Sequence, residues 1–205
     1  MSSLLPPIPP PLATPQIEQL PITPPNLADK PSPNVKLSTL RRIGAVVVAW
    51  GRLENAINDL IWTIDGKTIS NGRFDTQELD ISKLLSALQR SVSTKMPGQS
   101  LQNERKAITN LITIINEFKT YRNRVVHGTW AELNNIPVVG SLRFETTHND
   151  FVTFESYDHD RLRVIEQVAR DGTSTVGMFI SRIESLRETL FQQQQTEQSK
   201  NPSGL

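Results

Sequence analysis

The sequence has no cysteine, little net charge and no long apolar run, and each absence excludes a class of protein. Without cysteine the chain forms no disulfide, binds no zinc through thiolates and has no thiol nucleophile. A net charge of +1 excludes a protein that coats nucleic acid by charge alone. The longest wholly apolar run, Ala45–Trp50, is too short to span a bilayer, and the first residues lack a signal peptide's basic and apolar regions. We therefore expect a cytoplasmic protein without a membrane segment.

Proline is nearly absent from the middle of the chain, because 11 of the 14 prolines fall within the first 33 residues. This part also lacks aromatic residues, so burial cannot offset the entropy of ordering it. We expect residues 1–34 to be a disordered proline-rich tail, a semi-rigid tether whose Pro-x-x-Pro spacing also fits peptide-binding domains with aromatic grooves. The glutamine-rich residues 192–205 predict a second disordered tail, which leaves 35–191 as one domain.

Between the tails, apolar residues recur at helical spacing in four segments. The expected helices cover residues 38–64, 75–92, 101–127 and 158–191. Ser38 is a suitable cap for the first helix, Asp65-Gly66 ends it, and Gly128 is placed for a left-handed cap of the third. Residues 138–154 change to a pattern that predicts a two-stranded hairpin. The predicted fold is mainly α: a four-helix bundle with a β-hairpin insertion before the last helix.

Two charged residues occupy positions where the helical pattern expects apolar ones. Glu54 lies within the apolar arc of the first helix, and Arg122 lies within that of the third. A charged side chain removed from water alone costs several kcal/mol, so each needs a partner. We expect Glu54 and Arg122 to meet across a helix–helix contact, either as a clamp that fixes helix register or as part of a functional site.

The densest group of chemically useful residues is Tyr121–Trp130, at the end of the third helix. Asn123 and His127 are four residues apart and share a helical face, with Arg124 beside them. The long Arg122 side chain can reach the same place. Because the negative end of the helix dipole favours protonated His127, an imidazole beside two guanidinium groups could bind a phosphate and move a proton. The alternative is a histidine that only caps the helix.

The spacing Arg122-Asn123-x-x-x-His127 resembles the signature of the HEPN superfamily, an arginine and a polar residue followed by a histidine four to six residues after the arginine. The surroundings are similar too. Many prokaryotic members have an early helix that reads like Trp50-Gly51-Arg52-Leu53-Glu54 and continue the motif like His127-Gly128-x-Trp130. The resemblance implies a helical bundle and a metal-independent endoribonuclease, often a toxin or a phage-defence effector.

The resemblance also implies partners and residue roles. Such proteins commonly form homodimers whose two motifs face one RNA-binding groove, so we expect a homodimer that acts on single-stranded or looped RNA. An antitoxin or another protein would be a further partner. Carried over, Arg122 would neutralise the scissile phosphate, His127 would act as general base or acid toward the RNA 2′-hydroxyl, and Asn123 would orient one of them. Cleavage would leave a 2′,3′-cyclic phosphate without any cofactor or metal. The supporting residues would be Glu54, Arg124 and Trp130.

Many members of this superfamily are inactive, and that leaves alternatives open. One alternative is a non-catalytic helical bundle that mediates protein assembly, and another is a regulator that binds RNA or DNA without cleavage. Other polar residues predict ordinary roles: Asp158 and Asp160 as helix caps, and His148 as an exposed residue at the hairpin tip. The expected solvated face of the last helix consists of Arg161, Arg163 and Arg170.

Overall fold

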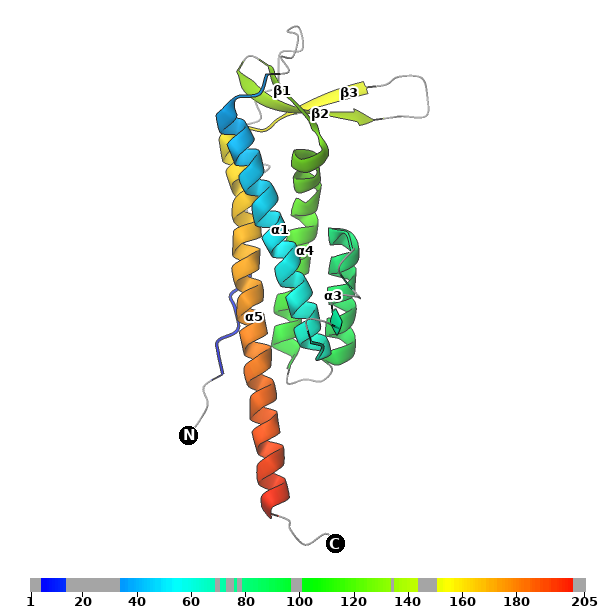
Figure 1. Ribbon diagram of the computed structural model, residues 1–205, viewed down its shortest axis with the longest axis vertical. Helices are drawn as coiled ribbons and strands as arrows, with labels where there is room; N and C mark the ends of the chain where they lie inside the picture. Colours follow the sequence, from blue (N-terminus) through cyan, green and yellow to red (C-terminus); the bar gives the residue numbers. More distant parts are fainter. Residues whose placement is uncertain are drawn as a thin grey trace. The chain divides into compact units, whose positions relative to one another are not determined.

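The computed structural model of the chain describes residues 5–13, 34–68, 71–72, 76, 79–96, 101–133, 135–143 and 151–200. Its elements follow in the order α1 (Leu37–Asp65), α3 (Ile81–Lys95), α4 (Gln102–His127), β1 (Thr129–Leu133), β2 (Ile136–Arg143), β3 (Phe151–Ser156) and α5 (His159–Lys200) (Figure 1). The described chain is therefore mainly helical, with a small antiparallel sheet between α4 and α5. The prediction of a helical bundle with strands inserted before the last helix is confirmed. None of the described helices combines the length and apolarity needed to cross a membrane.

The two ends of α1 differ in how well the sequence predicted them. Gly66 ends the helix as expected: its φ is 70°, and its N–H donates to the Thr63 carbonyl at 3.3 Å. The next N–H, of Lys67, donates to the Trp62 carbonyl at 2.9 Å, which completes a Schellman turn. The prediction that Ser38 caps the start was wrong, because α1 begins one residue earlier, at Leu37.

Aspartates begin the later helices. Asp80 caps α3 by accepting a hydrogen bond from the Lys83 N–H at 3.0 Å, while the predicted start at residue 75 lies outside the described residues. Asp158 caps α5 in the same way, accepting from the Arg161 N–H at 2.7 Å, as its position predicted. α5 continues to Lys200, beyond the expected end near residue 191, so part of the predicted carboxyl-terminal tail is helical.

The chain divides into two compact units, and three helices contribute to both. Unit 1 comprises Met1–Leu12, Glu54–Ile112 and Thr173–Leu205, and unit 2 comprises Ala13–Leu53 and Thr113–Gly172. Each unit has its own set of buried apolar side chains.

Unit 1 is built from α3 and from segments of α1, α4 and α5. Its fully buried residues are Ile57, Leu60, Leu88, Ile108 and Val176. Hydrogen bonds from polar side chains connect its segments. The Trp62 indole donates to the Thr76 hydroxyl at 3.0 Å, and Arg187 donates to the Ile64 carbonyl at 3.0 Å. Hence the indole N–H is buried with a partner, as a stable core requires.

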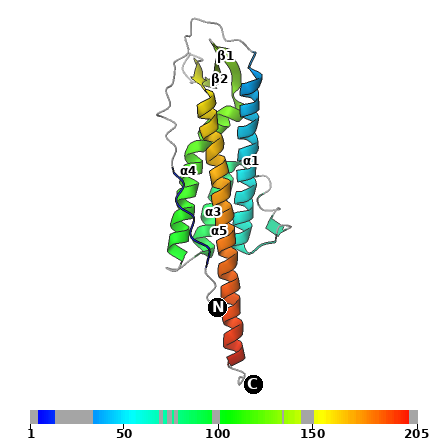
Figure 2. The ribbon, with the colours of Figure 1, turned by 90° about the vertical axis from the view of Figure 1, so that its left-hand side faces the viewer.

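The beginning of the chain also belongs to unit 1. The structure describes Leu5–Ala13, where Pro9 is buried and the Pro6 carbonyl accepts a hydrogen bond from Arg182 on α5. This stretch lies within the predicted disordered tail, yet it has a defined place along α5 (Figure 2). The rest of that predicted tail, residues 14–33, lies outside the described residues.

Unit 2 places the first half of α1 beside the first half of α5 (Figures 1 and 2). Trp50 is fully buried and donates from its indole nitrogen to the Ile165 carbonyl at 3.2 Å. Arg42 adds an ion pair to Glu166, with Nη1 3.0 Å from Oε2. Most apolar positions predicted for both helices form this core, which also contains Val46, Leu53, Phe118, Leu162 and Val168. The prediction that Val47 belongs to the buried stripe was wrong, because its side chain is 44% exposed.

The sheet of unit 2 has three strands in the order β1-β2-β3, all antiparallel. The predicted hairpin corresponds to β2 and β3, paired as Val138 with Ser156 and Val139 with Glu155. The prediction missed β1, which is only five residues long and pairs Trp130 with Val139. Asn135, with φ of 65°, makes the tight turn from β1 to β2. The predicted hairpin tip at His148 lies outside the described residues.

Candidate functional site

The last two turns of α4, in unit 2, carry the predicted catalytic residues. Asn123 and His127 are both exposed and lie on one face of the helix. Arg122 is half-buried, and its Nη1 donates to the Asn123 side-chain oxygen at 3.0 Å. The amide thus holds the guanidinium at the same end of the helix as the imidazole.

Arg124 is committed to a different contact. Its Nη1 lies 2.6 Å from Glu155 Oε2 on β3, and Arg161 Nη2 approaches the same oxygen at 3.8 Å. A carboxylate held by two guanidinium groups is largely neutralised. Arg124 therefore joins the end of α4 to the sheet, and the supporting role that the sequence predicted for it stays a prediction.

Trp130 fixes the first strand against the end of α4. Its indole nitrogen donates to the Val125 carbonyl at 2.9 Å, one of the carbonyls that the end of a helix leaves without an intrahelical partner. The ring meets Tyr157 edge-on, with centroids 5.9 Å apart. Trp130 thereby helps to set the direction in which the chain leaves His127, and its predicted supporting role stays a prediction.

Gly128, directly after His127, is needed for a reason that the sequence did not predict. Among the described glycines only Gly66 has a positive φ, so the expected left-handed cap at Gly128 was wrong. A Cβ at Gly128 would instead collide with the Val139 side chain and the Arg124 carbonyl. The absence of a side chain is what allows β2 to pack directly beneath the end of α4.

Arg161 is the main residue of this region that the sequence analysis misassigned. It was expected on a solvated helix face, but it is 8% exposed, whereas Arg163 and Arg170 are exposed. Its Nη1 donates to the Ser156 carbonyl at 2.9 Å, and its guanidinium carbon lies 4.4 Å from the Tyr157 ring centroid. The four-residue spacing from Tyr157 was the available signal for this cation–π contact.

Tyr157 shares the buried side of the same cluster. Burial raises the pKa of its phenol, and the nearby charge of Arg161 only partly offsets that effect. The hydroxyl therefore stays protonated at physiological pH. The cluster of Arg124, Glu155, Tyr157 and Arg161 thus connects the exposed end of α4 with β3 and the start of α5.

The predicted pairing of Glu54 with Arg122 stays a prediction. Glu54 is half-buried in unit 1, where its backbone carbonyl accepts a hydrogen bond from the Asn58 side chain at 3.1 Å. Arg122 is half-buried in unit 2. Both side chains are thus partly removed from water, as their positions on the apolar arcs predicted.

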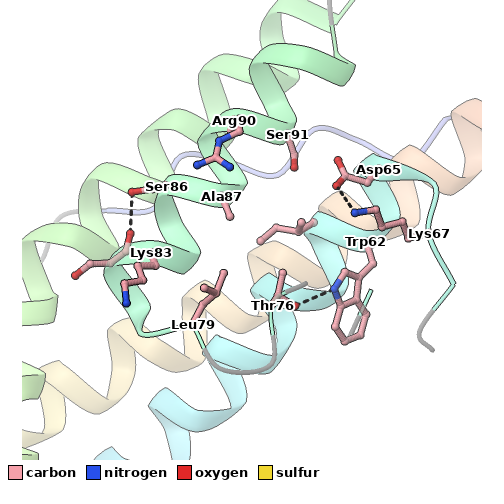
Figure 3. A pocket seen from close by; sticks show the side chains of 12 residues that line it. Trp62, Asp65, Lys67, Thr76, Leu79, Lys83, Ser86, Ala87, Arg90 and Ser91 are labelled. Carbon is pink, nitrogen blue, oxygen red and sulfur yellow. Dashed lines mark hydrogen bonds and ion pairs between the residues drawn. The ribbon is translucent and has the colours of Figure 1, made fainter. Parts of the chain in front are cut away.

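A pocket of about 650 Å³ lies in unit 1, between the end of α1 and one face of α3 (Figure 3). Small side chains at helical spacing leave this space open, chiefly Ser82, Ser86 and Ala87. Lys83 and Arg90 also line it. None of the predicted site residues lines this pocket, and the row of small residues on α3 is the signal that could have indicated it.

Within the described part of the chain, no three histidine and carboxylate side chains gather in a way that could hold a metal ion. Comparisons of this chain with protein-family models, with curated proteins and with solved structures found no match. The site is therefore interpreted from its own chemistry and from the resemblance of its short motif.

Proposed function

We propose that the chain is a metal-independent endoribonuclease of the HEPN type, acting on single-stranded or looped RNA. The observation that carries the proposal is the arrangement at the end of α4. An exposed imidazole, His127, shares this end with a guanidinium, Arg122, which the Asn123 amide holds at 3.0 Å. A proton-transfer group and a fixed cation are the two components that cleavage of a phosphodiester requires.

The proposed reaction is an internal transfer at phosphorus. The RNA 2′-oxygen attacks the phosphorus as its proton passes to His127, and the bond from phosphorus to the 5′-oxygen breaks. The leaving oxygen takes up a proton, and the product is a 2′,3′-cyclic phosphate. Arg122 stabilises the negative charge that grows on the phosphate oxygens, and Asn123 keeps the guanidinium in place.

Two neighbouring arginines have structural contacts of their own and would assist Arg122 only indirectly. Arg124 already contacts Glu155 at 2.6 Å, and Arg161 is buried beneath the aromatic ring of Tyr157. Neither can turn to a phosphate without giving up its contact with Glu155. Their positive charge nevertheless lies in the same unit and adds to the local attraction for RNA that the small net charge of the whole chain does not provide.

A second candidate function is protein assembly, and a separate observation favours it. On α1, within unit 2, Leu37, Leu40, Val47 and Val48 are 62%, 48%, 44% and 55% exposed. Exposed apolar residues in a row on one helix mark a surface where another protein packs. As a contact between two copies, this surface would provide the homodimer that the nuclease also requires. As a contact with an antitoxin or another protein, it would serve a toxin or a phage-defence effector.

Incubation of purified protein with RNA in the presence of a chelator tests the nuclease proposal. We expect cleavage with 2′,3′-cyclic phosphate ends, and a loss of roughly 100-fold or more in rate for His127→Ala. Arg122→Ala should have a comparable effect, and Arg122→Lys should restore only part of the rate, because lysine lacks the planar fork. His159→Ala is the matched control, since His159 is another exposed histidine of unit 2.

The same preparations distinguish the two candidate functions. RNA that stays intact with the native protein, or is cut equally by His127→Ala, would contradict the nuclease. Light scattering on native protein and on Val48→Glu then tests assembly. A homodimer that dissociates in the variant supports the α1 contact, whereas a native monomer at tens of micromolar concentration contradicts it.

A further inference from the structure

The amino-terminal segment Leu5–Leu12 is bound to unit 1 in the manner of a peptide ligand. Figures 1 and 2 show it along α5, and its Pro6 carbonyl accepts a hydrogen bond from Arg182 Nη1. Pro9 is buried, although proline is a residue type that mostly stays exposed to solvent. The contact therefore involves both the backbone and the side chains of the segment.

Burial along the segment repeats every three residues. Pro9 is buried and Pro6 and Leu12 are half-buried, whereas Pro7, Pro10 and Pro11 are exposed. Ile8, also half-buried, is the position that departs from this repeat. A polyproline II helix has three residues per turn, so residues three apart lie on one face. The face of Pro6, Pro9 and Leu12 is thus the one turned toward unit 1. Proline-rich ligands with Pro-x-x-Pro spacing also use the residues of one face of a polyproline II helix for binding.

Arg182 is prepared for this contact by Glu104 on α4. Its Nε lies 2.8 Å and its Nη2 2.6 Å from Glu104 Oε1, and the Glu104 side chain is only 3% exposed. Two of the three guanidinium nitrogens are therefore fixed, and the third, Nη1, donates to Pro6. A polyproline II backbone has no internal hydrogen bonds, so its carbonyls need such a donor. We define Arg182 and Glu104 as the centre of the proline site.

We propose that the proline site of unit 1 is a receptor for polyproline II segments, and that the segment Leu5–Leu12 of a second copy exchanges with the chain's own. The chain's own segment Leu5–Leu12 already lies in the proline site, so the same segment of a second copy has the sequence that fits it. The connecting residues 14–33 number 20, and a chain of that length extends to roughly 65 Å, long enough to reach a neighbouring copy. The exchange is independent of the residues proposed for RNA cleavage.

The first test measures binding of a fluorescently labelled peptide with the sequence of residues 3–15 to full-length chains. In Pro9→Glu the chain's own segment is displaced, because a carboxylate cannot be buried there, and the site opens. We expect this variant to bind the peptide at least about 10-fold more tightly than the native chain, whose tethered segment competes at high effective concentration. Adding Arg182→Gln should weaken the peptide binding about 10-fold or more.

Three controls establish whether the peptide binds at the proline site. Pro7→Glu changes an exposed proline of the same segment and should behave like the native chain. Arg187→Gln, combined with Pro9→Glu, removes another arginine of α5 and should retain peptide binding. If Arg182→Gln unfolds the protein, a peptide that itself carries Pro9→Glu provides the test and should not bind. If the peptide binds native and Pro9→Glu chains equally, or binds neither, the proposal that the proline site is a receptor is overturned.

The exchange between copies has its own measurement, which the absence of cysteine makes simple. One population carries a donor dye on Ser3→Cys and the other an acceptor on Lys106→Cys, an exposed position of unit 1. Mixing them should produce energy transfer that rises with concentration and is lost when the donor chain also carries Pro9→Glu. Absence of transfer at about 50 μM would overturn the exchange even where the peptide binds.

Discussion

The two ends of α4 use polar side chains in opposite ways. Near its start, in unit 1, Glu104 is 3% exposed and binds Arg182 at 2.6 Å. Near its end, in unit 2, Asn123 and His127 are exposed. Removing one partner of a buried ion pair lowers the stability strongly, because the remaining charge is shielded from water. Replacing an exposed polar residue changes the free energy of unfolding little. One helix therefore carries groups that stabilise the fold and groups that are available for chemistry, and it keeps them apart.

Breaking the buried pair should give the largest effect on stability. Glu104→Ala leaves Arg182 with a charge that only the Pro6 carbonyl and limited solvent can compensate. We expect the free energy of unfolding to fall by roughly 3 kcal/mol. The same measurement on His127→Ala and Asn123→Ala should give changes within about 0.5 kcal/mol. Urea unfolding followed by circular dichroism compares them, and similar losses for all three variants would contradict the contrast between the two ends.

A substitution at Gly128 tests whether the exposed end of α4 rests on a rigid base. In Gly128→Ala the new methyl group must displace the Val139 side chain or the Arg124 carbonyl, at a cost of roughly 1–3 kcal/mol. Gly51→Ala is the control, because its Cβ meets nothing within 4 Å and alanine favours a helix interior. The control should stabilise the protein by roughly 0.5–1 kcal/mol. Thermal or urea unfolding should show changes in the free energy of unfolding of opposite sign for the two variants. A Gly128→Ala variant as stable as the native protein would mean that the sheet shifts to accommodate the methyl group.

The helices and the position of the motif were predictable from the sequence because they depend on local signals. Apolar spacing placed α1, α4 and α5, and glycine and aspartate chemistry placed the ends at Gly66 and Asp158. His127 was expected in the last turn of a helix, and it is the last residue of α4. These features need only the few residues on either side of them.

What the sequence did not predict depends on contacts between distant residues. From its position in the sequence Arg161 resembles a solvated arginine, but in the structure it contacts the Tyr157 ring and the Ser156 carbonyl. Gly128 resembles a helix cap until β2 passes beneath it. The place of Pro6 depends on Arg182 of α5, far away in the sequence. Each of these residues has the chemical properties that the sequence indicates, but it contacts a residue that the sequence pattern does not predict. The spacing of apolar residues along the chain carries no information about such contacts.

Glu166 in unit 2 is an intermediate case between the two ends of α4, and its titration should give the smallest effect. Its side chain is 9% exposed, but its partners Arg42 and Arg170 are 37% and 56% exposed. Burial raises the pKa of the Glu166 carboxyl, but the hydrogen bonds from Arg170 and Arg42 outweigh it and hold the pKa below the ordinary 4.5.

A lowered pKa in the folded state makes the contribution of Glu166 to stability depend on pH. The contribution is fully present above the unfolded-state pKa near 4.5 and is lost as pH falls through the lower folded-state value. Glu166→Gln should therefore cost about 1 kcal/mol at pH 7 and progressively less below pH 4.5. Glu184→Gln, at an exposed position of α5, is the control substitution. A difference in the free energy of unfolding between native and Glu166→Gln that stays constant from pH 7 to below pH 4.5 would contradict this prediction. The carboxylate charge would then not stabilise unit 2, and Glu166 would resemble the exposed residues at the end of α4 in its small contribution to stability.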